Sequence, residues 1–246
     1  MYSAYGLRTV AGIAVSTALG LMVAASAASA QAQNDGKSTN NAVLSGKKAE
    51  RKESVVSTAA LAYDLFNFGK EKGDALHMAS ASRILASVYD SMKIDPAKGE
   101  IDHEGEAAAA EGGASPDPAS MLAEARAAAA GNDVLLAAID QPAATDRAFV
   151  SADQVFGRIS TVGPNREDPW KWRTAYANEW AEVAISGNGN TDLDLYVYDE
   201  NGNEVCRSVE VWDEEYCSFN PIWTGGFRIV VVNYGSSANT YQMWIQ

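Results

Sequence analysis

Residues 187–203 read GNGNTDLDLYVYDENGN, and the order of polar and apolar residues in this stretch predicts a β-hairpin. From Leu193 to Val197, apolar side chains occupy every second position, which is the period of a strand with one buried face. Asn201 and Gly202 follow, and this dipeptide is typical of a tight turn between antiparallel strands. The stretch therefore predicts a strand, a turn and a second strand that pairs with the first.

Similar short strands separated by turns are expected throughout the C-terminal part of the chain. Aromatic and β-branched residues alternate with polar ones there, and all six tryptophans lie at or beyond Trp170. The expected strands are 154–160, 171–177, 180–186, 193–199, 203–209, 215–219, 226–233 and 239–245. Short strands at regular spacing are typical of an antiparallel β-sandwich, so we predict that residues 147–246 form one.

The preceding residues are rich in alanine and have helical spacing. One apolar helical face is formed by Val55, Ala59, Ala62 and Phe66. The expected helices run from Glu53 or Ser54 to Gly69–Gly73, from the N-cap Asp74 to about Met92, over 119–130, and from Asn132 or Asp133 to a point before Pro142. The first two helices, joined by a short glycine-containing turn, are predicted to form an αα-hairpin.

Two domains follow from this change in pattern. Residues 53–143 are predicted to form a small α-helical N-terminal domain, and residues 147–246 a β-sandwich that folds independently of it. Within the helical domain, residues 94–118 are acidic and rich in Gly, Ala and Pro, so we interpret them as a flexible segment. The predicted fold class is α+β.

Residues 1–32 have the pattern of a secretory signal peptide. A single arginine precedes the apolar run 9–25, and small-x-small cleavage sites end at Ala30 and Ala32. The alternative is an uncleaved anchor helix, because about twenty apolar residues are enough to span a bilayer. The signal-peptide interpretation predicts a periplasmic or secreted protein whose mature chain has no transmembrane segment. Residues 33–52 are polar and predicted to be disordered.

Charge and motifs exclude several functional classes. The chain has 19 basic and 32 acidic residues, a net charge of −13, which argues against nucleic acid as a partner because phosphate contacts need clustered Lys and Arg. No Gly-x-Ser-x-Gly elbow, His-Glu-x-x-His pair or phosphate-binding glycine loop is present. The two histidines, His77 and His103, have no predictable partner. The sequence therefore favours a non-enzymatic protein.

Two carboxylates in the quoted strand form a candidate calcium site. Asp192 and Asp194 lie two residues apart, so both side chains point to the same face of the strand. Calcium takes 6–8 oxygen ligands, so two carboxylates need further donors, such as Asn190 in the preceding loop. The alternative is that the two acids form a solvated strand face with no metal.

The cysteines and one tryptophan are the remaining candidate site residues. Cys206 and Cys217 are the only cysteines, and an oxidising compartment favours a disulfide between them. If their strands pair with each other, the two side chains face each other across one ladder. Trp212 lies in the loop between them, where a core position is hardest to arrange, and it is the candidate ligand-binding residue. Most other tryptophans are interpreted as core.

Residues 191–205 (TDLDLYVYDENGNEV) and 224–243 (TGGFRIVVVNYGSSANTYQM) resemble the bacterial pre-peptidase C-terminal domain family. The matching positions are Asp192, Asp194, Leu195, Val197, Asp199, Gly202, Gly226, Phe227, Ile229, Val231, Asn233 and Tyr241. The resemblance covers roughly residues 150–246 and implies a jelly-roll-like sandwich that serves as a non-catalytic accessory module, in some relatives binding calcium or matrix polymers. The chain departs from the family in its cysteine pair and in lacking a preceding peptidase-like domain.

Three hypotheses about the function remain open at this point. We favour an exported non-catalytic binding or scaffolding protein, calcium-assisted, with a protein or polysaccharide partner. A carbohydrate-binding module would instead need a row of exposed tryptophans. An exported hydrolase would need a pocket that joins the helical domain to the sandwich and is lined by His77 and carboxylates.

Overall fold

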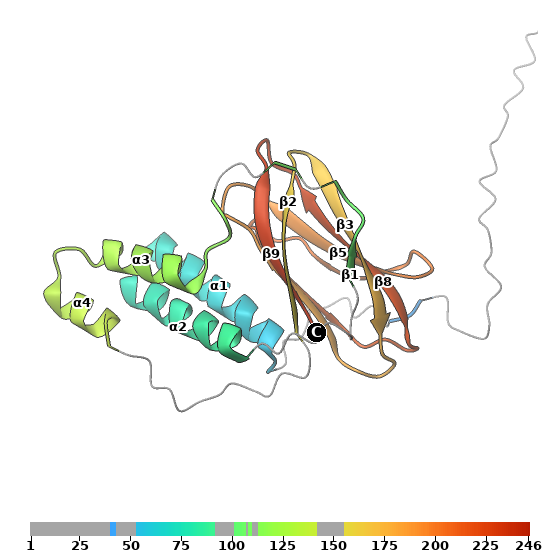
Figure 1. The fold of residues 1–246 in the computed structure, drawn as a ribbon, viewed down its shortest axis with the longest axis horizontal. Helices are drawn as coiled ribbons and strands as arrows, with labels where there is room; N and C mark the ends of the chain where they lie inside the picture. The colour runs from blue at the N-terminus through green and yellow to red at the C-terminus, as the bar shows by residue number, and fades with distance from the viewer. Residues whose placement is uncertain (1–39, 43–52, 92–100, 107, 110–112, 142–154) are drawn as a thin grey trace, which may run out of the picture. The chain divides into compact units, whose positions relative to one another are not determined.

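The computed structural model describes residues 40–42, 53–91, 101–106, 108–109, 113–141 and 155–246. The helices are α1 (Val55–Lys72), α2 (Ala75–Ser91), α3 (Pro118–Ala128) and α4 (Asp133–Ile139). The strands are β1 (Ile101–His103), β2 (Phe156–Val162), β3 (Arg166–Ala175), β4 (Ala181–Ser186), β5 (Leu193–Asp199), β6 (Glu204–Ser208), β7 (Glu214–Phe219), β8 (Gly225–Asn233) and β9 (Asn239–Ile245). This arrangement confirms the predicted α+β class (Figure 1).

The strands form an antiparallel sandwich of two sheets. The order is β1-β3-β8-β5-β6 in the five-stranded sheet and β2-β9-β4-β7 in the four-stranded sheet. The sandwich core lies between them, and it includes Leu193, Leu195 and Val197, each 0% exposed. The alternation in the hairpin sequence therefore predicted the buried face of β5 correctly. Strands β2 to β9 each overlap one of the expected strands.

Local capping explains where the helices begin and end. The Ser54 side chain accepts a hydrogen bond from the backbone N–H of Ser57, and the Ser57 side chain accepts one from Ser54 in return, which forms a capping box. Helix α1 ends at Gly73, whose φ of 64° is the left-handed conformation that glycine adopts most readily. Helix α3 begins behind the N-cap Asp117, with Pro118 in its first turn.

Strand β1 lies inside the segment 94–118, which was expected to be a linker. Ile101 pairs with Trp172 of β3 and His103 pairs with Trp170, so β1 is one edge strand of the five-stranded sheet. Ile101 is only 8% exposed and packs in the sandwich core. The structure differs from the expectation here because three residues are too few to show a period, and their burial depends on a distant strand.

Helix α1 packs on the outer face of the four-stranded sheet. The rings of Tyr63 in α1 and Trp244 in β9 have centroids 5.2 Å apart, and both side chains are almost fully buried. Ala184 of β4 and Tyr216 of β7 belong to the same apolar cluster as the buried faces of the helices. Helix α1 therefore packs against α2 on one side and against the sandwich on the other. The prediction that the helices and the sandwich fold independently stays to be tested.

Residues 40–42, within the stretch 33–52 expected to be disordered, are held against the sandwich. The Asn41 backbone N–H donates to Asp199 Oδ2 at 2.8 Å, and the N–H groups of Ile222 and Trp223 donate to Asn41 Oδ1. Asn41 is 0% exposed. The predicted signal peptide lies outside the described residues, and within those residues no helix has the length and apolar character needed to span a bilayer.

Candidate binding cleft beside Trp212

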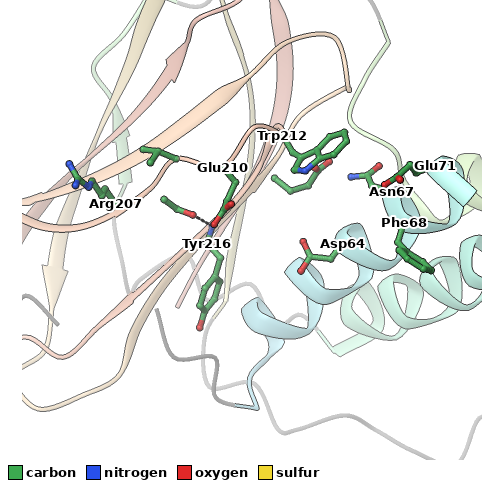
Figure 2. Close-up of a pocket in the computed structure, with 11 residues that line it drawn as sticks. Asp64, Asn67, Phe68, Glu71, Arg207, Glu210, Trp212 and Tyr216 are labelled. Atoms are coloured by element: carbon green, nitrogen blue, oxygen red, sulfur yellow. Dashed lines mark hydrogen bonds between the residues drawn. The ribbon is translucent and has the colours of Figure 1, made fainter. Parts of the chain in front are cut away.

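A cleft of about 480 Å³ separates helix α1 from the end of β6, the start of β7 and the loop between them (Figure 2). Its lining residues are Asp64, Asn67, Phe68 and Glu71 from α1, and Arg207, Ser208, Val209, Glu210, Trp212, Glu214 and Tyr216 from the sandwich. The volume falls in the range of about 300–1,000 Å³ that is typical of ligand pockets.

The α1 wall follows from helical geometry. Asp64, Asn67, Phe68 and Glu71 are spaced by three, four and seven residues, so they form one stripe along the helix. Phe66 lies outside this stripe and is fully buried, because it belongs to the apolar face that packs inside the molecule. One helix therefore contributes an apolar face to the core, and to the cleft a stripe of three polar residues and the Phe68 ring.

The opposite wall is held by the disulfide between Cys206 and Cys217, which the structure confirms, with a Cα–Cα distance of 5.9 Å. The expected cross-strand arrangement is wrong, however. Strand β6 is the edge of the five-stranded sheet and β7 the edge of the four-stranded sheet, so the two cysteines do not share a ladder. Cys217 points into the sandwich core, and the disulfide joins the two sheets where the chain crosses from one to the other.

Trp212 is the exposed aromatic residue of the sandwich wall. It is 57% exposed, whereas Trp170, Trp172, Trp223 and Trp244 are buried. Among the described residues it is the only exposed tryptophan, so the structure shows no row of exposed tryptophans there. In Figure 2, Trp212 lies toward the α1 side of the cleft, where Asn67 and Glu71 are found, and Arg207 lies at the far end.

Carboxylates dominate the polar groups of the cleft. Asp64 and Glu71 come from α1, Glu210 and Glu214 come from the sandwich, and Arg207 is the only cation in the lining. Burial, followed by the neighbouring Asp213 carboxylate, raises the pKa of Glu214 to about 9. A hydrogen bond from Asn67 opposes this rise.

An ammonium group of the chain already contacts two lining residues at the rim. The Lys72 Nζ atom lies 2.5 Å from Glu71 Oε1 and 5.9 Å from the centroid of the Phe68 ring. The first contact is an ion pair, and the second is a cation–π contact. The combination of a carboxylate and an aromatic ring on this rim therefore suits a primary ammonium group.

The three candidate calcium ligands have different surroundings in the structure. Asp194 is 8% exposed and accepts a hydrogen bond of 2.8 Å from the Tyr196 hydroxyl, whereas the buried Asp192 Oδ1 has no hydrogen-bond partner. Burial raises the pKa of Asp194, and the Tyr196 hydrogen bond opposes this rise. Asn190 is exposed and donates its backbone N–H to Asn188.

A different acid organises the loop that precedes β5. Asp213 is 4% exposed, and its Oδ2 accepts hydrogen bonds from the Gly189 backbone N–H at 2.5 Å and from the Asn239 side chain at 3.1 Å. The described part of the chain contains no group of three His, Cys, Asp or Glu residues placed to hold a metal. Calcium binding by Asp192, Asp194 and Asn190 therefore stays a prediction.

Neither histidine lines the cleft. His77, on α2, contacts Asp74 at 2.8 Å and stacks edge-on against Phe68, but it does not line the cavity. His103 contacts Asp168. The alternative of an exported hydrolase needs a pocket between the helices and the sandwich that is lined by His77 and carboxylates. The cleft lies between α1 and the sandwich and has the carboxylates, but His77 does not line it.

Asp168 anchors a buried polar cluster that sequence reasoning missed. It is 1% exposed and accepts hydrogen bonds from Ser160 Oγ at 2.7 Å and from the Tyr241 hydroxyl at 2.6 Å, besides its contact with His103. The His103 ring stacks on Trp170, with centroids 4.4 Å apart. These residues come from four different strands, and no local pattern links them.

A second cavity, of about 540 Å³, lies on the outer face of the five-stranded sheet beside the β5–β6 turn. Tyr198, Lys171 and Arg228 contribute to its lining. The Tyr196 and Tyr198 rings are nearly parallel, at 14°, with centroids 6.4 Å apart. The charges of this lining are more evenly balanced than those of the cleft beside Trp212, because Lys171 and Arg228 accompany Glu104, Asp199 and Glu200.

No protein-family model matches the chain, and a search of curated proteins found no match. Among solved structures, the pre-peptidase C-terminal domain of a collagenase from Bacillus anthracis is similar over 37% of this chain and 88% of its own, with 12% identity and a TM-score of 0.31. The Yersinia pseudotuberculosis-derived mitogen is similar over 38% and 85%, with 12% identity and a TM-score of 0.30. The module TmCBM61, solved with β-1,4-galactotriose, covers 38% and 86%, with 14% identity and a TM-score of 0.25. Likenesses this weak carry no argument about family or ligand.

Proposed function

We propose that this chain is a non-catalytic binding protein whose ligand lies in the cleft beside Trp212. The observation that carries the proposal is the exposure of Trp212, which is 57% exposed at the wall of a cavity of about 480 Å³. A large aromatic side chain left in solvent beside a cavity is the kind of residue that contributes most to binding energy. No other described tryptophan has this position.

The sandwich that presents Trp212 is proposed to be a module like the pre-peptidase C-terminal domains. Support comes from the sequence likeness of residues 191–205 and 224–243, which form β5, the β5–β6 turn, β8 and β9. Export by a cleaved signal peptide, to the periplasm or the medium, belongs to the same proposal. The disulfide is consistent with export, because such bonds persist in oxidising compartments.

Tryptophan fluorescence provides the test. We would titrate the parent and the Trp212→Phe variant with neutral oligosaccharides, cationic peptides, anionic peptides and calcium, and take the difference between them as the Trp212 signal. At least one class should change this signal and saturate. Trp212→Ala should then weaken binding of that class, because the variant loses the exposed ring.

Ile222→Ala is the matched control. Ile222 is 44% exposed and does not line the cleft, so its loss should leave the affinity unchanged. The proposal fails if no class binds, or if a bound class loses no affinity in Trp212→Ala.

A further inference from the structure

The walls of the cleft define the chemistry of its ligand. We propose that it binds an organic cation that carries primary ammonium groups on flexible alkyl stems, such as lysine side chains of a partner peptide or a free polyamine. The inference rests on the proposed function, since it names the ligand class of the same cleft.

Charge complementarity is the first argument. Asp64, Glu71 and Glu210 line the cleft as carboxylates, whereas Glu214, with its pKa raised to about 9, holds its proton at neutral pH and adds no charge. The lining has one guanidinium, Arg207, whose Nε lies 3.6 Å from Glu204, a residue that does not line the cavity. On α1, Asp64 and Glu71 are seven residues apart, which places them about 10 Å apart along the helix axis at 1.5 Å per residue. A ligand that meets both walls and both ends of this stripe therefore needs more than one positive charge.

The aromatic rings are the second argument, because they distinguish an organic cation from a metal ion. Phe68 is 47% exposed and Trp212 is 57% exposed, and both line the cavity. Ring faces attract cations and also pack against methylene groups, so an alkylammonium ion satisfies both properties. Calcium prefers a shell of oxygen ligands only and gains nothing from the rings.

The third argument is the contact that the chain makes with its own lysine. The Lys72 ammonium group contacts both the Glu71 carboxylate and the Phe68 ring, at the distances given above. An external lysine side chain that enters the cleft meets the same two kinds of group in the Trp212 ring and in the carboxylates of Asp64 and Glu210. The contact of Lys72 with a carboxylate and an aromatic ring is therefore the same kind of contact that we propose for the ammonium groups of the ligand.

Fluorescence anisotropy of labelled pentalysine tests the proposal on the full, disulfide-bonded chain. The parent should bind saturably at low ionic strength and more weakly as salt is added, because screening weakens exposed charge pairs. Pentalysine acetylated on every side chain keeps the stems but not the charges, and it should not bind. Spermidine competition shows whether a free polyamine or a peptide is preferred, and preference for either supports the proposal.

Variants locate the binding. Asp64→Asn combined with Glu210→Gln removes one acid from each wall and should weaken pentalysine binding about tenfold, as expected for the loss of two partly exposed charge pairs. The control, Asp133→Asn combined with Glu179→Gln, removes the same charge from exposed positions outside the cleft and should change the affinity less than twofold. Melting curves of both variants confirm that they are folded.

Three results would overturn the inference. The inference fails if pentalysine does not bind the parent protein. It also fails if the cleft variant and the control variant lose the same affinity for pentalysine, because that result would indicate a general attraction to an acidic surface. Calcium that displaces pentalysine better than spermidine does, at matched ionic strength, would assign the cleft to a metal. If a neutral oligosaccharide binds in a Trp212-dependent way and pentalysine does not, the proposed function stands and this inference fails.

Discussion

Glu215 is a buried acid whose removal should stabilise the protein at alkaline pH. Its side chain lies on β7 and is 2% exposed. Oε1 accepts a 2.7 Å hydrogen bond from the Glu210 backbone N–H, but Oε2 has no hydrogen-bond partner. Burial raises the pKa of Glu215 to about 8, although the hydrogen bonds from Ser208 and Glu210 oppose the rise.

The sign of the effect follows from proton binding. Between the ordinary pKa of 4.5 and the folded value of about 8, the folded protein holds a proton on Glu215 that the unfolded chain has released. The free energy of unfolding therefore falls as the pH rises through this window, and it is unaffected by Glu215 below it. The shift from 4.5 to about 8 corresponds to at most about 5 kcal/mol at about 1.4 kcal/mol per pKa unit, and water penetration reduces the measured value.

Glu215→Gln removes the ionisation and keeps a side-chain oxygen for the Glu210 N–H. Urea unfolding at pH 5 and pH 9 should show a gain in stability of the variant over the parent that is larger at pH 9 by several kcal/mol, within the limit of about 5 kcal/mol. Glu179→Gln, at an exposed turn position, should show no such change with pH. A difference between Glu215→Gln and the parent that is the same at both pH values would refute the reasoning.

Calcium binding, the disulfide and export are each open to a direct measurement. At constant ionic strength, a hundredfold excess of calcium over Kd should raise the free energy of unfolding of the parent protein by about 2.7 kcal/mol. The double variant Asp192→Asn, Asp194→Asn should gain no stability from calcium, and an equal gain in both proteins would contradict the site. Replacing Cys206 and Cys217 by alanine should cost about 3 kcal/mol in urea unfolding, and an unchanged midpoint would mean that the bond contributes little. N-terminal sequencing of the exported protein should show cleavage near Ala30 or Ala32, whereas an intact initiator methionine would exclude it.

Local sequence by itself determined most of the secondary structure. The alternation through Leu193, Leu195 and Val197 predicted β5 and its buried face, because side chains on a strand point to opposite faces in turn. Ser54 and Gly73 mark the two ends of α1, because the hydroxyl and the left-handed glycine satisfy groups that a helix end leaves unpaired. These signals act within a few residues, and therefore a single sequence contains them.

Only the tertiary structure decided which distant residues meet. Cys206 and Cys217 were paired correctly from composition, yet their position between two sheets depends on strand order, which no local period encodes. The cleft needs Asp64 and Trp212, which are separated by nearly the whole helical region and much of the sandwich. Strand β1 is likewise too short for a pattern and forms because β3 offers it an unpaired edge. Periodicity specifies which face of an element is buried, whereas the contacts between elements come from packing of the whole chain, and the candidate site lies at such a contact.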